Sequence, residues 1–335
     1  MKKIINPNWK KAGFVDEPIS PGLNLSKEIR KMCEEKNAVV LAHFYTHGEV
    51  QDVADFVGDS LALAQWASNT DASVIVMCGV HFMGETCKIL CPDKKVLVCD
   101  LNAGCSLADS CKANDLKEFI KKHPGYKVVS YVNTTADVKA LSDVVVTSSN
   151  AKIIVDSYDI NEKLIFGPDK NLGNYINSVT GRDMLLWNGG CHVHGQFSLE
   201  GILKLKELHP KAKLLVHPEC PKPIQLIADV IGSTSGLLKY AMNSDVDEFI
   251  VATESGILHK MTNNCPNKNF IPAPPETSEN IGCSCNECEY MKLNTLKKLY
   301  NTLKFEWPEV FVDKKLVEKA IKPINKMLEI SKNIK

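Results

Sequence analysis

Short, continuous apolar runs rich in β-branched residues alternate with longer segments of helical periodicity along most of the chain. Nine runs stand out, at residues 38–44, 73–79, 95–100, 127–132, 151–157, 163–167, 183–188, 213–217 and 248–253. Apolar runs without polar alternation are typical of parallel strands that are covered on both faces. Strands that alternate with helices therefore predict an α/β fold built on parallel sheets.

The pattern repeats three times along the chain. Residues 39–60, 128–149 and 214–235 each contain a strand, a polar turn, a helix with an Ala-Asp or Ser-Asp pair, and a hydroxyl-rich turn. The residue that ends the strand lies 17 positions before a hydroxyl residue in every copy: His43 and Ser60, Tyr131 and Ser148, His217 and Thr234. Agreement at three places indicates homologous units.

Each copy continues through a second strand, a glycine-bearing turn and a third segment that leads to cysteine. These cysteines are Cys105, Cys191 and the group from Cys283 to Cys288. We predict three homologous three-layer α/β/α units at residues 1–108, 109–194 and 195–335. Because open α/β sheets bind ligands at the carboxyl ends of their strands, we expect an active site at the junction of the units, around a pseudo-threefold axis. The alternative is one doubly wound sheet with scattered cysteines.

Charge and hydropathy narrow the function. Forty basic and forty acidic residues cancel, which argues against nucleic acid as a partner. The chain has no apolar run of about 18 residues for a membrane span, and its first residues lack the apolar stretch of a signal peptide. We therefore expect a cytoplasmic protein. In that compartment the thirteen cysteines are expected as thiols, some of them with metal-binding or catalytic roles.

Three cysteines from three units suggest an iron–sulfur cluster. A [4Fe–4S] cluster held by three thiolates keeps one open iron, and an open iron is a Lewis acid suited to removing water from a polar metabolite. A structural zinc site normally needs four ligands, and only Cys285 and Cys288 form a CxxC pair. A zinc-stapled module without catalytic activity is the alternative.

The hydroxyl-rich turns predict an anion site. Ser60, Ser148, Ser233 and Thr234 resemble N-caps of the helices that follow, and helix N-termini attract phosphate and carboxylate groups. No nucleotide-binding glycine motif is present, so a small phosphorylated or carboxylated molecule is expected. The side chains expected around it can exchange protons or donate hydrogen bonds; they are His43, Tyr45, Tyr131, Asn133, His194, His217 and Glu219.

Eleven motifs in order, from Lys36 to beyond Met291, resemble the quinolinate synthase family. They are AHFYTHGEVQDVAD, GDSL, CGVHFMGETCKIL, YVNTTADVKA, TSSNA, GPDKNLG, WNGGCHVH, HPEC, GSTSG, TESGI and a late cysteine followed by EYM. The resemblance implies condensation of iminoaspartate with dihydroxyacetone phosphate to quinolinate for NAD biosynthesis, with loss of phosphate and two waters. It also suggests an aspartate oxidase or dehydrogenase that supplies the imine. Another [4Fe–4S] hydro-lyase acting on a small anion is the second enzyme hypothesis.

The resemblance also implies roles for residues. The cluster ligands would be Cys105, Cys191 and Cys288, although the CSCNEC stretch leaves Cys283 and Cys285 as alternatives for the third. Glu219 is the first choice for proton transfer, followed by His43, Tyr45 and Tyr131. Cys285 and Cys288 form a hypothetical redox-sensitive pair. The implied substrate site consists of His43, Ser60, Tyr131, Asn133, Ser148, His194, His217, Glu219, Ser233 and Thr234.

Overall fold

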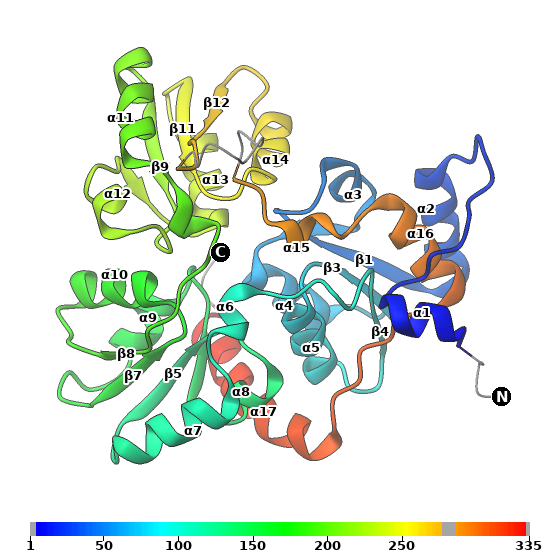
Figure 1. Cartoon of the computed structure of the whole chain (residues 1–335), viewed down its shortest axis with the longest axis horizontal. Helices are drawn as coiled ribbons and strands as arrows, with labels where there is room; N and C mark the ends of the chain where they lie inside the picture. Colours follow the sequence, from blue (N-terminus) through cyan, green and yellow to red (C-terminus); the bar gives the residue numbers. More distant parts are fainter. Residues whose placement is uncertain (1–4, 277–285, 333–335) are drawn as a thin grey trace. The chain divides into compact units, whose positions relative to one another are not determined.

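Three parallel sheets of four strands form the framework of the protein (Figure 1). The structure is a computed structural model and describes residues 5–276 and 286–332. Every sheet has the strand order second, first, third, fourth. The sheets consist of β1 (Ala38–His43), β2 (Phe56–Gly58), β3 (Val74–Cys78) and β4 (Lys95–Val98); β5 (Lys127–Tyr131), β6 (Val144–Val146), β7 (Leu164–Gly167) and β8 (Leu185–Leu186); and β9 (Lys213–Val216), β10 (Val230–Ile231), β11 (Glu248–Ala252) and β12 (Asn269–Pro272). The predicted α/β fold with parallel sheets is confirmed.

Helices connect the strands and cover the sheets. Residue contacts divide the chain into two compact units, Met1–Cys105 with Glu289–Val317, and Ser106–Cys288 with Glu318–Lys335. The boundaries predicted at residues 109 and 195 stay predictions. The helices are α1 (Pro7–Ala12), α2 (Leu25–Lys36), α3 (Gly48–Val53), α4 (Ser60–Asn69), α5 (His81–Leu90), α6 (Ser106–Asp109), α7 (Ala113–Lys122), α8 (Ala136–Lys139), α9 (Ala151–Asp156), α10 (Lys170–Thr180), the 3₁₀ helix η1 (His194–Gln196), α11 (Leu199–Leu208), α12 (Lys222–Leu226), α13 (Thr234–Asn243), α14 (Ile257–Asn264), α15 (Glu289–Lys292), α16 (Leu296–Phe305) and α17 (Lys314–Ile330).

The first sheet shows why its strands are apolar throughout. Val40 of β1 and Val76 of β3 share a buried core with Leu299 of α16 and Ile29 of α2. Elsewhere in the sheet, Val98 lies directly under α5, where a Cβ on Gly84 would come within 2.7 Å of its side chain. Successive residues of a strand point to opposite faces of the sheet. Because helices pack on both faces, the residues on each face must be apolar.

An aspartate fixes the start of the first strand in every copy. This residue lies twelve positions after the strand-end residue, and its carboxylate accepts a hydrogen bond from a backbone N–H near the beginning of that strand. The bonds join Asp55 to Val40 (2.7 Å), Asp143 to Val128 (2.8 Å), and Asp229 to Leu214 (2.8 Å). The Ala-Asp and Ser-Asp pairs of the sequence repeat are therefore structural anchors.

Two predictions of local structure were wrong. Residues 151–157 contain helix α9 (Ala151–Asp156) and not a strand, because this segment follows the hydroxyl-rich turn, where all three copies place a helix. Its isoleucines and valine favour strands locally, but tertiary packing overrides that weak preference. The helices that follow the hydroxyl-rich turns are α4, α9 and α13, and their N-caps are Asp59, Asn150 and Ser233. Only the third copy therefore uses a serine as predicted. Among the described residues, no helix is long and apolar enough to cross a membrane.

Candidate functional site

The turn after β9 places a carboxylate beside a tyrosine from the neighbouring sheet of the same unit. Tyr131 is the last residue of β5, and its hydroxyl donates a 2.5 Å hydrogen bond to Oε1 of Glu219. Both side chains are buried. The turn is closed by the N–H of Cys220, which donates to the carbonyl of His217. Two residues from the predicted set therefore meet through a direct hydrogen bond.

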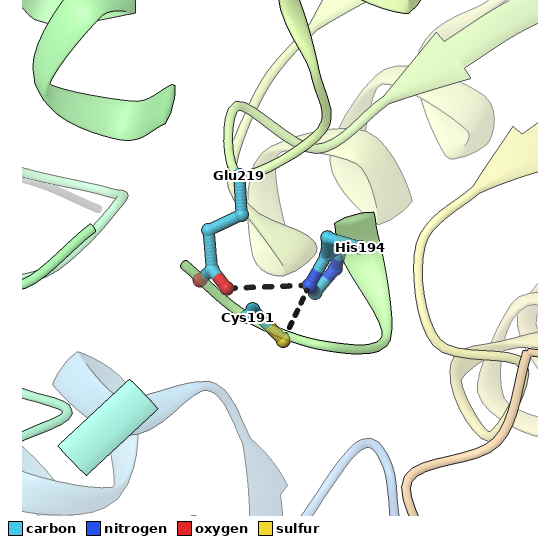
Figure 2. A group of neighbouring side chains, drawn as sticks. All are labelled: Cys191, His194 and Glu219. Atoms are coloured by element: carbon cyan, nitrogen blue, oxygen red, sulfur yellow. Dashed lines mark hydrogen bonds and ion pairs between the residues drawn. The ribbon is translucent and has the colours of Figure 1, made fainter. Parts of the chain in front are cut away.

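Glu219 also joins a cysteine and a histidine that follow β8 (Figure 2). Nδ1 of His194 lies 3.2 Å from Sγ of Cys191 and 3.2 Å from Oε2 of Glu219. The opposite ring nitrogen, Nε2, lies 3.0 Å from the hydroxyl of Thr253. Both ring nitrogens of His194 therefore have partners, and Nδ1 is the ring atom that contacts the cysteine sulfur.

The charges of this group are set by burial and by its neighbours. Burial alone raises the pKa of Glu219, but the positive charge and hydrogen bond of His194, the charge of His217 and the hydroxyl of Tyr131 outweigh it and bring the pKa to about 2. Burial, and next the charge of Glu219, raise the pKa of Asp169 well above its usual range. The pKa values of two nearby carboxyl groups are therefore displaced in opposite directions, a pattern typical of functional sites.

His217 connects this group to the hydroxyl-rich turn of the middle copy. Its Nε2 lies 3.3 Å from Oγ of Ser148, and its Nδ1 accepts the backbone N–H of Glu219 at 3.4 Å. The ring also packs against that of His194, with centroids 4.7 Å apart. In the third copy, Ser233 caps α13 by accepting the N–H of Gly236.

Asn133 and Thr234 lie in the same unit. Thr234 is buried at the first position of α13. Oδ1 of Asn133 is buried without a hydrogen-bond partner among the described residues. An unsatisfied buried acceptor of this kind is typical of a place where a ligand or ordered water supplies the donor.

The first unit carries its own set of predicted residues. The rings of His43 and Tyr45 pack edge to face with centroids 4.5 Å apart, and Nδ1 of His43 accepts the N–H of Tyr45 at 3.2 Å. The ammonium of Lys292 donates to the carbonyl of Tyr45. Ser60 begins α4, and Cys105 follows the turn after β4. This unit is described by itself, as is the unit that holds Cys191.

The predicted cluster ligands differ from the other cysteines in exposure. The structure describes eleven cysteines, all of them thiols rather than halves of disulfides. Eight are buried, and the three that are partly exposed are Cys105, Cys191 and Cys288. Cys283 and Cys285 lie outside the described residues, and so does the predicted Cys285–Cys288 pair.

Sequence reasoning missed three polar residues around the cysteines. Asp169 accepts the N–H of Cys191 through Oδ2 at 3.3 Å. The buried Glu254 accepts the N–H of Cys288 through Oε1 at 3.0 Å. With Thr253, these residues follow the third strands, β7 and β11, inside the glycine-bearing motifs GPDKNLG and TESGI. An acid two residues after a buried strand was the available signal.

Comparison with known proteins identifies the family of this chain. The family model described as "Quinolinate synthetase A protein" matches residues 27–329. The quinolinate synthase of Chloroherpeton thalassium is 51% identical over 323 residues, covering 96% of this chain and 99% of the relative. The quinolinate synthase of Microcystis aeruginosa is 50% identical over 308 residues (92% and 95%), and that of Synechocystis sp. is 51% identical over 303 residues (90% and 94%). The chain belongs to the quinolinate synthetase A family.

Proposed function

We propose that this protein is a quinolinate synthase of NAD biosynthesis, which condenses iminoaspartate with dihydroxyacetone phosphate and releases phosphate and two waters. The observation that carries the proposal is the group formed by the buried Tyr131, Glu219 and His194 with the partly exposed Cys191, in a chain about 50% identical to quinolinate synthases over nearly its full length. A thiol, an imidazole, a carboxylate and a phenol in direct contact provide both metal binding and proton exchange.

A [4Fe–4S] cluster with three cysteine ligands fits the donor set. We propose Cys105, Cys191 and Cys288 as the ligands, because thiolates select iron–sulfur clusters and these three are the partly exposed thiols of the described residues. The neighbours of Cys191 also fit, since the N–H of His194 lies at its sulfur and hydrogen bonds to sulfur tune such centres. When bound, the cluster would supply a Lewis acid at its open iron.

The surrounding side chains have separable roles in this proposal. Glu219, held as a carboxylate by His194 and Tyr131, accepts a proton once bound substrate adds negative charge beside it and raises its pKa. The hydroxyl of Tyr131 donates a hydrogen bond to the carboxylate of Glu219. His43 and Tyr45 serve as the corresponding pair in the first unit.

The substrates are proposed to be held as anions. His217 with Ser148, the N-terminus of α13 at Ser233 and Thr234, and the N-terminus of α4 at Ser60 would bind phosphate or carboxylate oxygens. Asn133 has a buried oxygen that needs a donor, which a substrate hydroxyl supplies. An aspartate oxidase or dehydrogenase would supply the imine, and a cytoplasmic location agrees with cysteines that are thiols throughout the described residues.

The first test is the metal content of protein purified without oxygen, together with quinolinate formation. We expect about four irons and four sulfides per chain, and quinolinate formation that requires both an aspartate-derived imine and dihydroxyacetone phosphate. Zinc in place of iron would instead favour the zinc-stapled module. An intact cluster without phosphate release would favour another iron–sulfur hydro-lyase.

A further inference from the structure

One side chain occupies the same place behind the turn in all three copies of the repeat. It lies eight residues after the strand-end residue, in the short helix that follows the turn, and it is Gln51 in α3, Lys139 in α8 and Gln225 in α12. In each copy the turn itself carries a candidate site residue two positions after the strand end: Tyr45, Asn133 and Glu219, respectively.

The two glutamines make the same pair of hydrogen bonds. Nε2 of Gln51 donates to the carbonyls of Phe44 (2.8 Å) and Thr46 (3.0 Å), the residues on either side of Tyr45. Nε2 of Gln225 likewise donates to the carbonyls of Pro218 (2.8 Å) and Cys220 (2.7 Å), on either side of Glu219. One amide thus binds the carbonyl groups of both residues that flank the site residue.

The middle copy makes the equivalent contact with a charged group. Nζ of Lys139 donates to the carbonyl of Thr134, which directly follows Asn133. Lys139 is fully buried, with 0% of its surface exposed. A lysine is rarely buried in this way, because removing its ammonium group from water is costly unless polar partners surround it. Its position indicates that this copy also requires a donor behind the turn.

The held turn also determines how two histidines present their rings. The N–H of Tyr45 donates to Nδ1 of His43 at 3.2 Å, and the N–H of Glu219 donates to Nδ1 of His217 at 3.4 Å. In the neutral form of either ring, an Nδ1 that accepts this hydrogen bond carries no proton, and the proton is on Nε2. If the turn changed its shape, this N–H would move away from Nδ1, and the proton of the neutral imidazole would no longer be confined to Nε2.

We propose that Gln51, Lys139 and Gln225 are positioning residues, which hold the three turns so that Tyr45, Asn133, Glu219 and the two histidines keep their working geometry. Their shared requirement is a donor that reaches the carbonyls flanking the site residue; the amide or ammonium identity is secondary. The reaction that these turns serve rests on the proposed function. The assignment of the three positioning residues rests on the hydrogen bonds described above.

Exchanging the residues between copies tests this requirement. Gln225→Glu keeps the shape but places a carboxylate against two carbonyls, whereas Gln225→Lys installs the donor that the middle copy uses. In the purified iron–sulfur enzyme we expect Gln225→Glu to lower kcat about 10- to 100-fold with a smaller change in KM, because small displacements of reacting groups have effects of this size. Gln225→Lys should recover at least about tenfold of that loss.

Hydrogen exchange provides a readout that is independent of the reaction. The amides of His217, Glu219 and Cys220 should exchange faster in Gln225→Glu than in Gln225→Lys, because the turn is held only in the second variant. Leu226→Glu is the matched control, since it adds the same charge at an exposed position of the same helix. It should leave both kcat and exchange within about twofold of the parent protein.

Two results would overturn the proposal: equal kcat for Gln225→Glu and Leu226→Glu, or no gain from lysine over glutamate. If Gln225→Glu does not fold, Lys139→Gln and Lys139→Met decide, because only glutamine keeps a donor. At least about tenfold higher kcat in Lys139→Gln supports the proposal, and equal values oppose it. An absence of quinolinate from the parent protein would instead reject the proposed function, and hydrogen exchange would still test the turns.

Discussion

The turns after β1 and β9 have the same framework and different chemistry. In both, a strand-end histidine accepts the N–H of the second residue on, its carbonyl accepts the N–H of the third, and a glutamine amide binds the two flanking carbonyls. The second residue is Tyr45 in one turn and Glu219 in the other. The difference shows that the copies share their backbone geometry, while the residue at one position in each turn differs in its chemistry.

The surroundings of that position differ as strongly as the residue itself. Tyr45 contacts the ring of His43, and its carbonyl accepts from Lys292. Glu219 contacts His194 and Tyr131 through its side chain. The first turn therefore presents an aromatic hydroxyl, whereas the third presents a carboxylate whose pKa is lowered to about 2 by its partners against the effect of burial.

The largest effect is expected from a comparison of Cys191, which we propose as a cluster ligand, with a buried cysteine near the same turn. Cys191→Ala should lose the cluster, with quinolinate formation falling at least about 1,000-fold, because one of three ligands is removed. Cys220→Ala should retain the cluster, since Cys220 is fully buried and burial raises the pKa of its thiol well above the usual range. Iron content and the visible spectrum measure both. Loss of iron from Cys220→Ala alone would reverse these assignments.

The next effect separates the two turns directly. Glu219→Gln should lower kcat about 100- to 1,000-fold while iron content is unchanged, because it removes both the proton acceptor and the negative partner of His194. Tyr45→Phe should lower kcat about tenfold, the lower end expected for one polar contact to the reacting groups. Steady-state kinetics with both substrates measures the difference. Equal losses in the two variants would contradict the division of roles between the turns.

The sequence supports the fold well because its signals are local. Strand, turn, helix and hydroxyl residue recur at constant spacing, so the three sheets and the grouping of Tyr131, His217 and Glu219 at strand ends could be predicted. The strand predicted at residues 151–157 was wrong because its β-branched residues favour strands locally, whereas its position in the repeat corresponds to a helix. Asp169 and Glu254 were missed because their partners are backbone N–H groups 22 and 34 residues away, which residue types do not reveal.

A smaller effect should follow from removing the contact between the middle and third copies. Tyr131→Phe deletes the 2.5 Å hydrogen bond to Glu219 and leaves a buried carboxylate with one donor fewer. We expect kcat/KM to fall about 10- to 100-fold and the thermal midpoint to decrease, since a hydrogen bond to a charged group contributes about 1.5–3 kcal/mol. Tyr126→Phe, at a partly buried tyrosine outside this group, is the control. Equal behaviour of the two variants would exclude Tyr131 from the site.

The smallest effect is expected at the aspartate that anchors the first strand of each copy. The anchoring hydrogen bond is the same in the copies, but the charged partners of the aspartate differ. Asp229 anchors the N–H of Leu214 and pairs with Lys206 and Lys213. Burial raises the pKa of Asp229, but the hydrogen bonds from Leu214, Lys213 and Lys206 outweigh it, and the net pKa is lowered. A lowered folded pKa means that the stabilisation is complete above the unfolded value of about 3.9 and is lost as the pH falls through the folded value.

Asp229→Asn should therefore destabilise the protein by about 1–2 kcal/mol near neutral pH, a value kept small because the ion pairs are partly solvated. The difference in thermal midpoint between parent and variant should begin to shrink as the pH is lowered below about 4, and should continue to shrink toward the lowered folded pKa, where the parent carboxylate also becomes neutral. Asp55→Asn makes the same change in the first copy, where Arg30 is the partner at 2.9 Å. Midpoints measured from pH 7 to pH 3 test this expectation, and a difference for Asp229→Asn that does not vary with pH would show that the anchor acts through its shape rather than its charge.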